Sequence, residues 1–289
     1  MTKLGRERLY PVWEYIEQNL EGQFGLNQIA FFSNLSPWHF HRFFKKHQKE
    51  NVQNYIKRLK IEKAAYELKI SDFPILEIAM EAGYESNEAF TRAFKRYMGA
   101  TPSQYRSKLK KTNKPKVNLK GLVFPEGIQQ KEFRKKEIAP FEIVYVRHIG
   151  SYSDLPGPLS DSKEVKLLLT FINTISSLPE NHKWVGISLD DPNISPEDKI
   201  RFDLGITVGN KIHSVPHLGK QTVTGGKYLQ VRYRGSYTNL PSIYEFLMQD
   251  YIPAEKIHLR NSPPFEIYMN PLGKEKEEKI TDIYLPIQK

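Results

Sequence analysis

The sequence predicts two domains: an N-terminal all-α domain with two helix-turn-helix motifs, and a C-terminal α+β domain built from a duplicated βαββ unit. Three observations indicate this fold class: a length of 289 residues, an internal repeat in each half of the chain, and a change from helical to strand-like periodicity between the halves. A chain of this length is too long to fold around a single hydrophobic core of ordinary size. We place the domains at 1–107 and 126–289, with a linker over 108–125.

The composition narrows the class of protein. Cysteine is absent, which removes disulfides, zinc–thiolate sites and thiol nucleophiles together. No apolar run is long enough to cross a bilayer, and the N-terminus lacks the apolar stretch of a signal peptide. We therefore expect a cytoplasmic protein with no membrane contact, no cofactor and no metal site.

The excess positive charge is confined to the first part of the chain. Residues 1–120 contain 22 Lys and Arg against 12 Asp and Glu, whereas the remaining 169 residues contain 21 of each. A basic module of this size is typical of proteins that bind a polyanion, because neutralised phosphates release counterions. Charge alone leaves open a basic domain without such a partner.

The N-terminal half carries a repeat at an offset of 50 residues. The stretch HFHRFFKKHQKENVQNYIK, from His39, aligns with AFTRAFKRYMGATPSQYRS, from Ala89. Each copy follows a short amphipathic stretch (26–32 and 75–82) and a turn, which predicts a helix, a tight turn and a second helix. Gly83 in the second turn adopts a positive φ easily, whereas Asn34 in the first does so less readily.

The outward faces of the two second helices carry side chains suited to DNA. Arginine pairs with guanine, asparagine with adenine, and a carboxylate with cytosine, whereas lysines and helix N-caps suit phosphates. A solvated face is the alternative for either helix, but an exposed aromatic such as Trp38 argues against it. We expect base contacts from Trp38, His41, Arg42, Asn87, Glu88, Thr91 and Arg92. We expect phosphate contacts from Ser36, Lys45, Ser86 and Lys95.

Residues 9–107 resemble the DNA-binding domain of the AraC/XylS family of transcription regulators. The resemblance is carried by SPWHFHRFFK and by ILEIAMEAGYESNEAFTRAFKRYMGATPSQYR. It implies about seven helices, with two recognition helices held by a long helix near Val52–Leu68 and entering successive major grooves. One chain would then suffice to bind double-stranded DNA at the nucleoid, and RNA polymerase is the implied partner in activation. His41 and Glu88 stand where relatives often carry glutamine, so promoter preference does not transfer.

The C-terminal half repeats itself at an offset of 85 residues. VRHIGSYSDLP, from Val146, aligns with VRYRGSYTNLP, from Val231. Each copy begins with a strand-like run, turns at Gly-Ser-Tyr, continues as a helix (163–175 and 242–248) and ends in two further strand candidates. Two such βαββ units predict one α+β domain with pseudo-twofold symmetry and a groove between its halves.

Residues 128–289 resemble the GyrI-like, or SOUL-type, effector-binding domain, through YVRHIGSY, VRYRGSY, PPFEIYMNP and TDIYLPIQK. The order of the two resemblances is that of the Rob subgroup. The resemblance to the GyrI-like domain implies a small-molecule effector. It also implies a glutamate in the groove that pairs with cationic aromatic ligands between aromatic walls. Glu266 matches that glutamate, and Tyr268 follows on the same strand face. Trp184, Tyr145 and Tyr233 are the expected wall residues, unless they only fill the core.

The chain lacks common enzyme motifs. It contains no Gly-rich phosphate loop, no GxSxG elbow and no HExxH, so we assign no catalytic residue and do not expect an enzyme. Two alternatives to a ligand-controlled regulator stay open. One is a DNA-binding protein whose GyrI-like domain hydrolyses or sequesters a toxic ligand, with Glu266 activating water. The other is an architectural DNA binder without sequence preference.

Overall fold

The computed structural model describes residues 3–22, 25–112, 121–155, 158, 160–175, 181–209, 212, 215, 217–271 and 278–288. The chain divides into two compact units, Met1–Lys110 with Val215–Gly219, and Lys111–Ser214 with Lys220–Lys289. No helix in these ranges is long and apolar enough to span a membrane. The expected linker begins as helix, because the last helix of the first unit continues to Thr112. Residues 113–120 lie outside the described residues.

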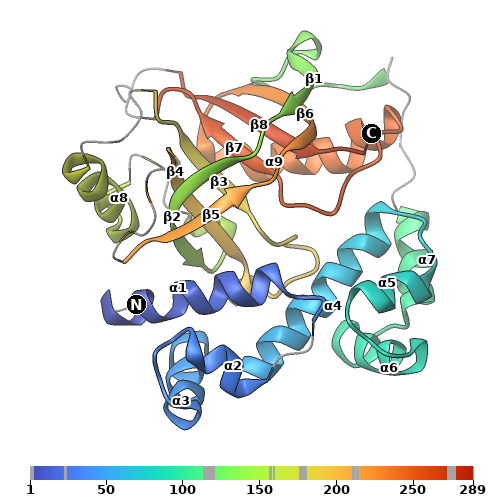
Figure 1. The fold of residues 1–289 in the computed structure, drawn as a ribbon. Coiled ribbons are helices and arrows are strands. Elements are labelled where there is room, and N and C mark those ends of the chain that lie inside the picture. Colours follow the sequence, from blue (N-terminus) through green and yellow to red (C-terminus); the bar gives the residue numbers. More distant parts are fainter. Residues whose placement is uncertain are drawn as a thin grey trace. The chain divides into compact units, whose positions relative to one another are not determined.

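The first unit is entirely helical, as its periodicity predicts (Figure 1). Its helices in the described part of the chain are α1 (Lys3–Gln18), α2 (Leu26–Phe31), α3 (Pro37–Gln48), α4 (Val52–Ile70), α5 (Ile75–Glu81), α6 (Asn87–Met98) and α7 (Pro102–Thr112). Figure 1 shows α4 running between the α2–α3 pair and the α5–α6 pair. The two predicted helix-turn-helix motifs are therefore present, one on each side of a central helix.

The sequence repeat produces the same packing in both motifs. In the first motif, the Phe40 and Phe44 rings lie 5.6 Å apart, and Phe44 lies 5.4 Å from the Tyr55 ring. In the second motif, three aromatic residues repeat this arrangement at 5.4 Å and 5.4 Å: Phe90, Phe94 and Tyr105. All four phenylalanines are fully buried. These rings fix the inner face of each second helix, and therefore which side chains it exposes.

Both interhelical turns use a left-handed residue. Asn34 adopts φ 53° and Gly83 adopts φ 73°. A Cβ at Gly83 would lie 2.5 Å from the carbonyl oxygen of Glu21. The second turn thus requires glycine for both space and conformation, whereas the first accommodates asparagine.

The second unit contains one eight-stranded sheet in the order β1-β6-β8-β7-β3-β4-β2-β5 among the described residues. The strands are β1 (Phe133–Ile138), β2 (Phe141–Ile149), β3 (Trp184–Ser188), β4 (Arg201–Val208), β5 (Gly219–Val223), β6 (Gly226–Arg234), β7 (Phe265–Tyr268) and β8 (Ile280–Pro286). The helices are α8 (Lys163–Thr174), α9 (Leu240–Phe246) with its π-helical extension Leu247–Tyr251, and α10 (Ile252–Ala254). The predicted α+β fold with two βαββ copies is confirmed.

Each copy gains one strand that its sequence pattern did not predict. β1 precedes the first copy but pairs antiparallel with β6 of the second. β5 precedes the second copy but lies beside β2 of the first. This exchange of edge strands joins the two copies into a single sheet, in addition to the central β3–β7 pairing.

The pairing register separates two faces of this sheet. Because directly opposite residues share a face, Glu266 lies on the same side as Gly186 and Ile283. α8 packs against β2 and β4, and Tyr244 of α9 faces Glu266. We call this side the helix face. The other side, which carries Asp282 and its neighbours, is called the opposite face.

Candidate nucleic-acid interface and ligand site

Serine caps start both second helices. The Ser36 hydroxyl accepts a hydrogen bond from the His39 N–H at 3.5 Å, and Pro37 occupies the first turn of α3. The Ser86 hydroxyl accepts from the Ala89 N–H at 3.2 Å at the start of α6. Each cap satisfies one free donor of the first turn, and the remaining N–H groups of that turn suit an anion.

The outer face of α3 exposes an aromatic–arginine pair. Trp38 is 61% exposed, and the Arg42 guanidinium lies over its indole ring at 4.7 Å from the centroid. A cation–π contact of this kind holds the arginine in a defined direction before any partner is bound. His41 and Lys45 are exposed on the same helix. All four side chains expected to face outward from α3 are therefore accessible.

The corresponding face of α6 is also accessible. Asn87, Glu88, Arg92 and Lys95 are exposed, whereas Thr91 is half-buried. Arg92 occupies the position in α6 that Arg42 occupies in α3. The helix thus presents both hydrogen-bond donors and hydrogen-bond acceptors, which are the groups that pair with base edges in a groove.

A buried ion network fastens both motifs to α4. Arg58 of α4 donates to Glu50, which follows α3, at 2.8 Å and to Glu62 of α4 at 3.0 Å. The Tyr97 hydroxyl of α6 donates to the other oxygen of Glu62. Although burial alone would lower the pKa of Arg58, the two carboxylates raise it. Sequence reasoning missed this network; the i, i+4 spacing of Arg58 and Glu62 was its only signal.

On the sheet, Glu266 is a buried carboxylate. It is 4% exposed, and its Oε2 accepts a hydrogen bond of 2.7 Å from the Tyr268 hydroxyl. Burial raises the pKa of Glu266 from its ordinary 4.5 to about 6, against the opposing effect of Tyr268. The Tyr244 hydroxyl of α9 also faces the carboxylate, but it forms no hydrogen bond with a described residue.

Replacing Glu266 with glutamine is expected to stabilise the second unit at alkaline pH. The raised pKa means that the folded state of the unaltered chain favours the protonated carboxyl. The stability that this protonated Glu266 contributes is complete below pH 4.5 and is lost as the pH rises through about 6. At pH 8 the glutamine should add about 1–2 kcal/mol to the free energy of unfolding, and at pH 4 nothing. Denaturant unfolding at both pH values measures this; equal effects at both would contradict the raised pKa.

Gly186 provides the space in which the Tyr268–Glu266 bond forms. It pairs directly with Glu266 across β3 and β7. A Cβ at this position would lie 2.5 Å from the Tyr268 hydroxyl and 2.7 Å from Cζ of Phe202. Glycine in the first copy therefore leaves room for the acidic residue and its tyrosine in the second, so the site is one-sided.

Tyrosines from both repeats converge on Glu266. Tyr152 and Tyr237 end the two Gly-Ser-Tyr turns, and burial raises the pKa of both hydroxyls. The Glu266 carboxylate adds to this rise at Tyr237, whereas at Tyr152 the charge of Asp190 contributes more than that of Glu266. The Tyr237 ring lies 5.1 Å from the Tyr268 ring. The hydroxyls of Tyr237 and Tyr244 are buried without a hydrogen-bond partner among the described residues. The Gly-Ser-Tyr repeat could have identified Tyr152 and Tyr237 as site residues, but it was read only as a turn.

Two of the three expected wall residues share the helix face with Glu266. Trp184 pairs with Tyr268, and Tyr233 lies in the same row through Thr281. The expectation for Tyr145 needs correction: it pairs with Gly205, one register position away from the residues of the helix face, and so lies on the opposite face. Side chains alternate along a strand, so a shift of one position reverses the face.

Comparisons with known proteins agree with this architecture. The family described as GyrI-like small molecule binding domain matches residues 131–288, and the helix-turn-helix domain family matches residues 29–108. The multiple antibiotic resistance protein MarA of Escherichia coli (strain K12) is 37% identical over 98 residues, which are 34% of this chain and 77% of that protein.

Two further matches cover one unit each. The regulatory protein SoxS of Salmonella typhimurium is 33% identical over 96 residues, 33% of this chain and 90% of that protein. The crystal structure of the EcmrR C-terminal domain matches at 18% identity with a TM-score of 0.45, covering 54% of this chain and 97% of that chain. With paired helix-turn-helix motifs and an acidic, tyrosine-lined site, the chain belongs to the AraC/XylS family of DNA-binding transcription regulators and carries a GyrI-like small molecule binding domain.

Proposed function

We propose that this chain is a transcription activator that binds its promoter as a monomer, inserts α3 and α6 into two successive major grooves and recruits RNA polymerase. The observation that carries the proposal is the repeated presentation of arginine: Arg42 and Arg92 are exposed at equivalent positions of two serine-capped helices. Two such helices on one chain supply both half-contacts, so a second copy is not needed. Catalysis has no part in this proposal.

The proposed contacts divide by chemistry. The arginines and Asn87 read purine edges in the grooves, while the capped N-termini and the lysines hold the phosphate backbone. Thr91 is half-buried and contributes only its exposed part. The base readers are Trp38, His41, Arg42, Asn87, Glu88, Thr91 and Arg92. The phosphate contacts are Ser36, Lys45, Ser86 and Lys95.

Selection of binding sites from a random duplex library tests this reading. We expect one asymmetric sequence of about 20 bp, bound by one chain and contacted in two major-groove segments about one helical turn apart. Adding the protein to purified RNA polymerase on a template with this site should increase transcription. Uniform affinity for all sequences, falling steeply with salt, would instead identify an architectural DNA binder. Two chains per site, or less transcript, would contradict the monomer or the activator.

We further propose that the Glu266 site senses a hydrophobic cation. A buried carboxylate without a cationic partner is unfavourable, and the unpartnered hydroxyls of Tyr237 and Tyr244 lie beside it. An aromatic cation would neutralise the carboxylate and contact the ring faces that surround it. Trp184 and Tyr233 are the more distant walls of the proposed site.

The affinity for such a cation should rise with pH. Because the pKa of Glu266 is about 6, only a small fraction of the carboxyl is ionised at pH 5 and nearly all at pH 8, which predicts an increase of about tenfold in affinity. Benzyltrimethylammonium and its neutral isostere neopentylbenzene are matched probes for titration of the full chain. The neutral compound should show no such rise, and Glu266→Gln should abolish it for the cation. Unchanged pH dependence in that variant would remove Glu266 from the site.

A further inference from the structure

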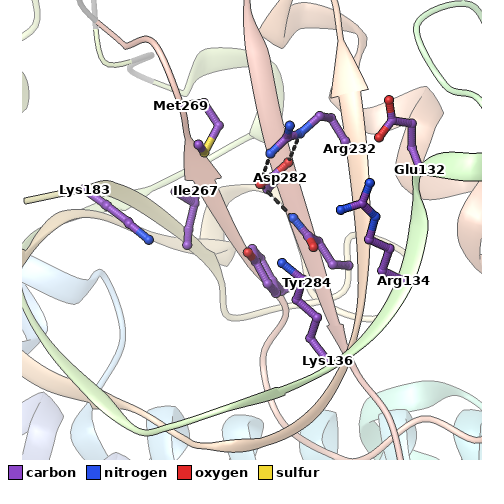
Figure 2. A pocket seen from close by; sticks show the side chains of 10 residues that line it. Glu132, Arg134, Lys136, Lys183, Arg232, Ile267, Met269, Asp282 and Tyr284 are labelled. Atoms are coloured by element: carbon purple, nitrogen blue, oxygen red, sulfur yellow. Dashed lines mark hydrogen bonds and ion pairs between the residues drawn. The ribbon is translucent and has the colours of Figure 1, made fainter. Parts of the chain in front are cut away.

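A pocket of about 210 Å³ opens on the opposite face of the sheet, away from Glu266. Its lining comes from β1, β6, β7 and β8, together with Glu132 just before β1, Lys183 just before β3 and Met269 just after β7 (Figure 2). We propose that this pocket binds a small oxyanion, a phosphate or carboxylate, attached to a compact apolar body. The volume lies below the usual range of about 300–1,000 Å³ for ligand pockets, which favours a small ligand. This site is independent of the proposed cation site.

Free positive charge surrounds the pocket. Arg134 and Lys136 both extend from β1, and their alternate positions on the strand place them on the same face. Figure 2 shows Lys136 reaching towards Tyr284 from one side and Lys183 pointing inward from the other. None of these three cations forms an ion pair within the described ranges of the chain, so each is available to an anion.

The carboxylates of the pocket do not cancel this charge. Asp282 accepts two hydrogen bonds from the Arg232 guanidinium, at 2.7 and 2.8 Å. Glu132 is paired with Arg234 at 3.3 Å. Each carboxylate thus has its own arginine, and the three remaining cations leave the pocket with a net positive charge.

An apolar floor and one free acceptor define the rest of the ligand. Tyr284 stacks on Phe265 at 4.5 Å with 7° between the ring planes, which fixes its ring beside Ile267 and Met269. A ring or short alkyl group fits against these side chains. Gln230 donates to Asp282, but its carbonyl oxygen is buried without a partner among the described residues. A hydroxyl or amide on the ligand would satisfy it.

In the first copy of the duplicated unit, the ion pair at the position equivalent to this pocket is fully buried. There Arg147 and Asp203 form the corresponding pair, and both side chains have zero exposure. Gln221 donates to that aspartate at 2.7 Å. In the second copy Arg232 retains 33% exposure. The duplication has therefore kept one ion pair for structure and left the other at the edge of an open, positively charged pocket.

Titration of the full chain with phenyl phosphate tests the proposal. We expect saturable binding that weakens with salt, and at least a tenfold loss of affinity in the double variant Arg134→Gln/Lys136→Gln. Lys135→Gln is the matched control, because it removes a cation from the same strand on the other side of the sheet. It should bind normally, as should Glu266→Gln. Benzoate should compete for the site, whereas benzylamine should not bind there.

Several outcomes would overturn the proposal. Absence of saturable binding of both phenyl phosphate and benzoate would remove the site. Equal losses in Lys135→Gln and the double variant would show a general charge effect. Inorganic phosphate binding as tightly as phenyl phosphate would contradict the apolar body. All substituted basic residues are exposed, and thermal unfolding of each variant checks that the fold is retained.

Discussion

Replacing Arg58 with methionine is expected to lower the free energy of unfolding of the helical unit by about 3–5 kcal/mol, because it leaves one buried and one partly buried carboxylate without their cation. Arg58 is 6% exposed, and its partners Glu50 and Glu62 are 14% and 5% exposed. Solvent therefore screens this network weakly. Denaturant unfolding of the full chain, followed by circular dichroism in the helical region, measures the loss.

The adjacent lysine supplies the control for this prediction. Lys57 is exposed on α4, so Lys57→Met changes the charge equally but should shift stability by less than about 0.5 kcal/mol. Tyr97→Phe should lie between the two, because it removes one hydrogen bond, with an effect of about 1 kcal/mol. If Arg58→Met were no more destabilising than Lys57→Met, the network would not hold the two motifs together.

A loss of similar size is expected for Arg147→Met in the sheet. The Arg147 guanidinium donates to both oxygens of Asp203 at 2.8 Å, and both side chains are fully buried. Removing the arginine leaves the buried Asp203 carboxylate without its cation, although Gln221 still donates to it at 2.7 Å, and this predicts a loss of about 3–5 kcal/mol. Urea unfolding measures this loss by the fluorescence of Trp184, in a full chain whose other two tryptophans, Trp13 and Trp38, are replaced by phenylalanine.

Two further variants separate the ion pair from the packing. Arg232→Met at the equivalent position of the second copy should be less destabilising, since Arg232 is partly exposed. The double variant Arg147→Met/Asp203→Leu should recover much of the lost stability, because replacing a whole buried pair by apolar residues is often neutral. A double variant as unstable as Arg147→Met would show that shape, rather than an unpaired charge, causes the loss.

Local periodicity predicted most of the fold, because repeated motifs carry their own packing. The phenylalanines of both helix-turn-helix copies alternate with outward-facing residues in the same pattern, so the exposed faces of α3 and α6 followed directly. The strands that begin at Phe141 and Gly226 were visible for the same reason. In each of these elements, the face that is buried is encoded within a few neighbouring residues.

Features that depend on long-range pairing were missed. β1 reads FRKKEI and has charges where a strand pattern needs apolar residues; it becomes a strand by pairing with β6 at the edge of the sheet. Tyr145 was assigned to the wrong face because register between distant strands is not encoded in one strand. Glu266 was identified, but its tyrosine neighbours from other elements were not.

Titration of the selected duplex with the Arg42→Ala and Arg92→Ala variants tests the central claim most directly. Each substitution should reduce the binding free energy by about 1–3 kcal/mol on the selected site and by much less on scrambled DNA of the same length. Lys135→Ala removes an exposed cation of the sheet that belongs to neither proposed site; it is the control and should bind both duplexes as the unaltered chain does. Selective loss on the chosen site in both helix variants is the predicted result. Equal weakening on selected and scrambled DNA would mean that α3 and α6 hold phosphates without reading sequence.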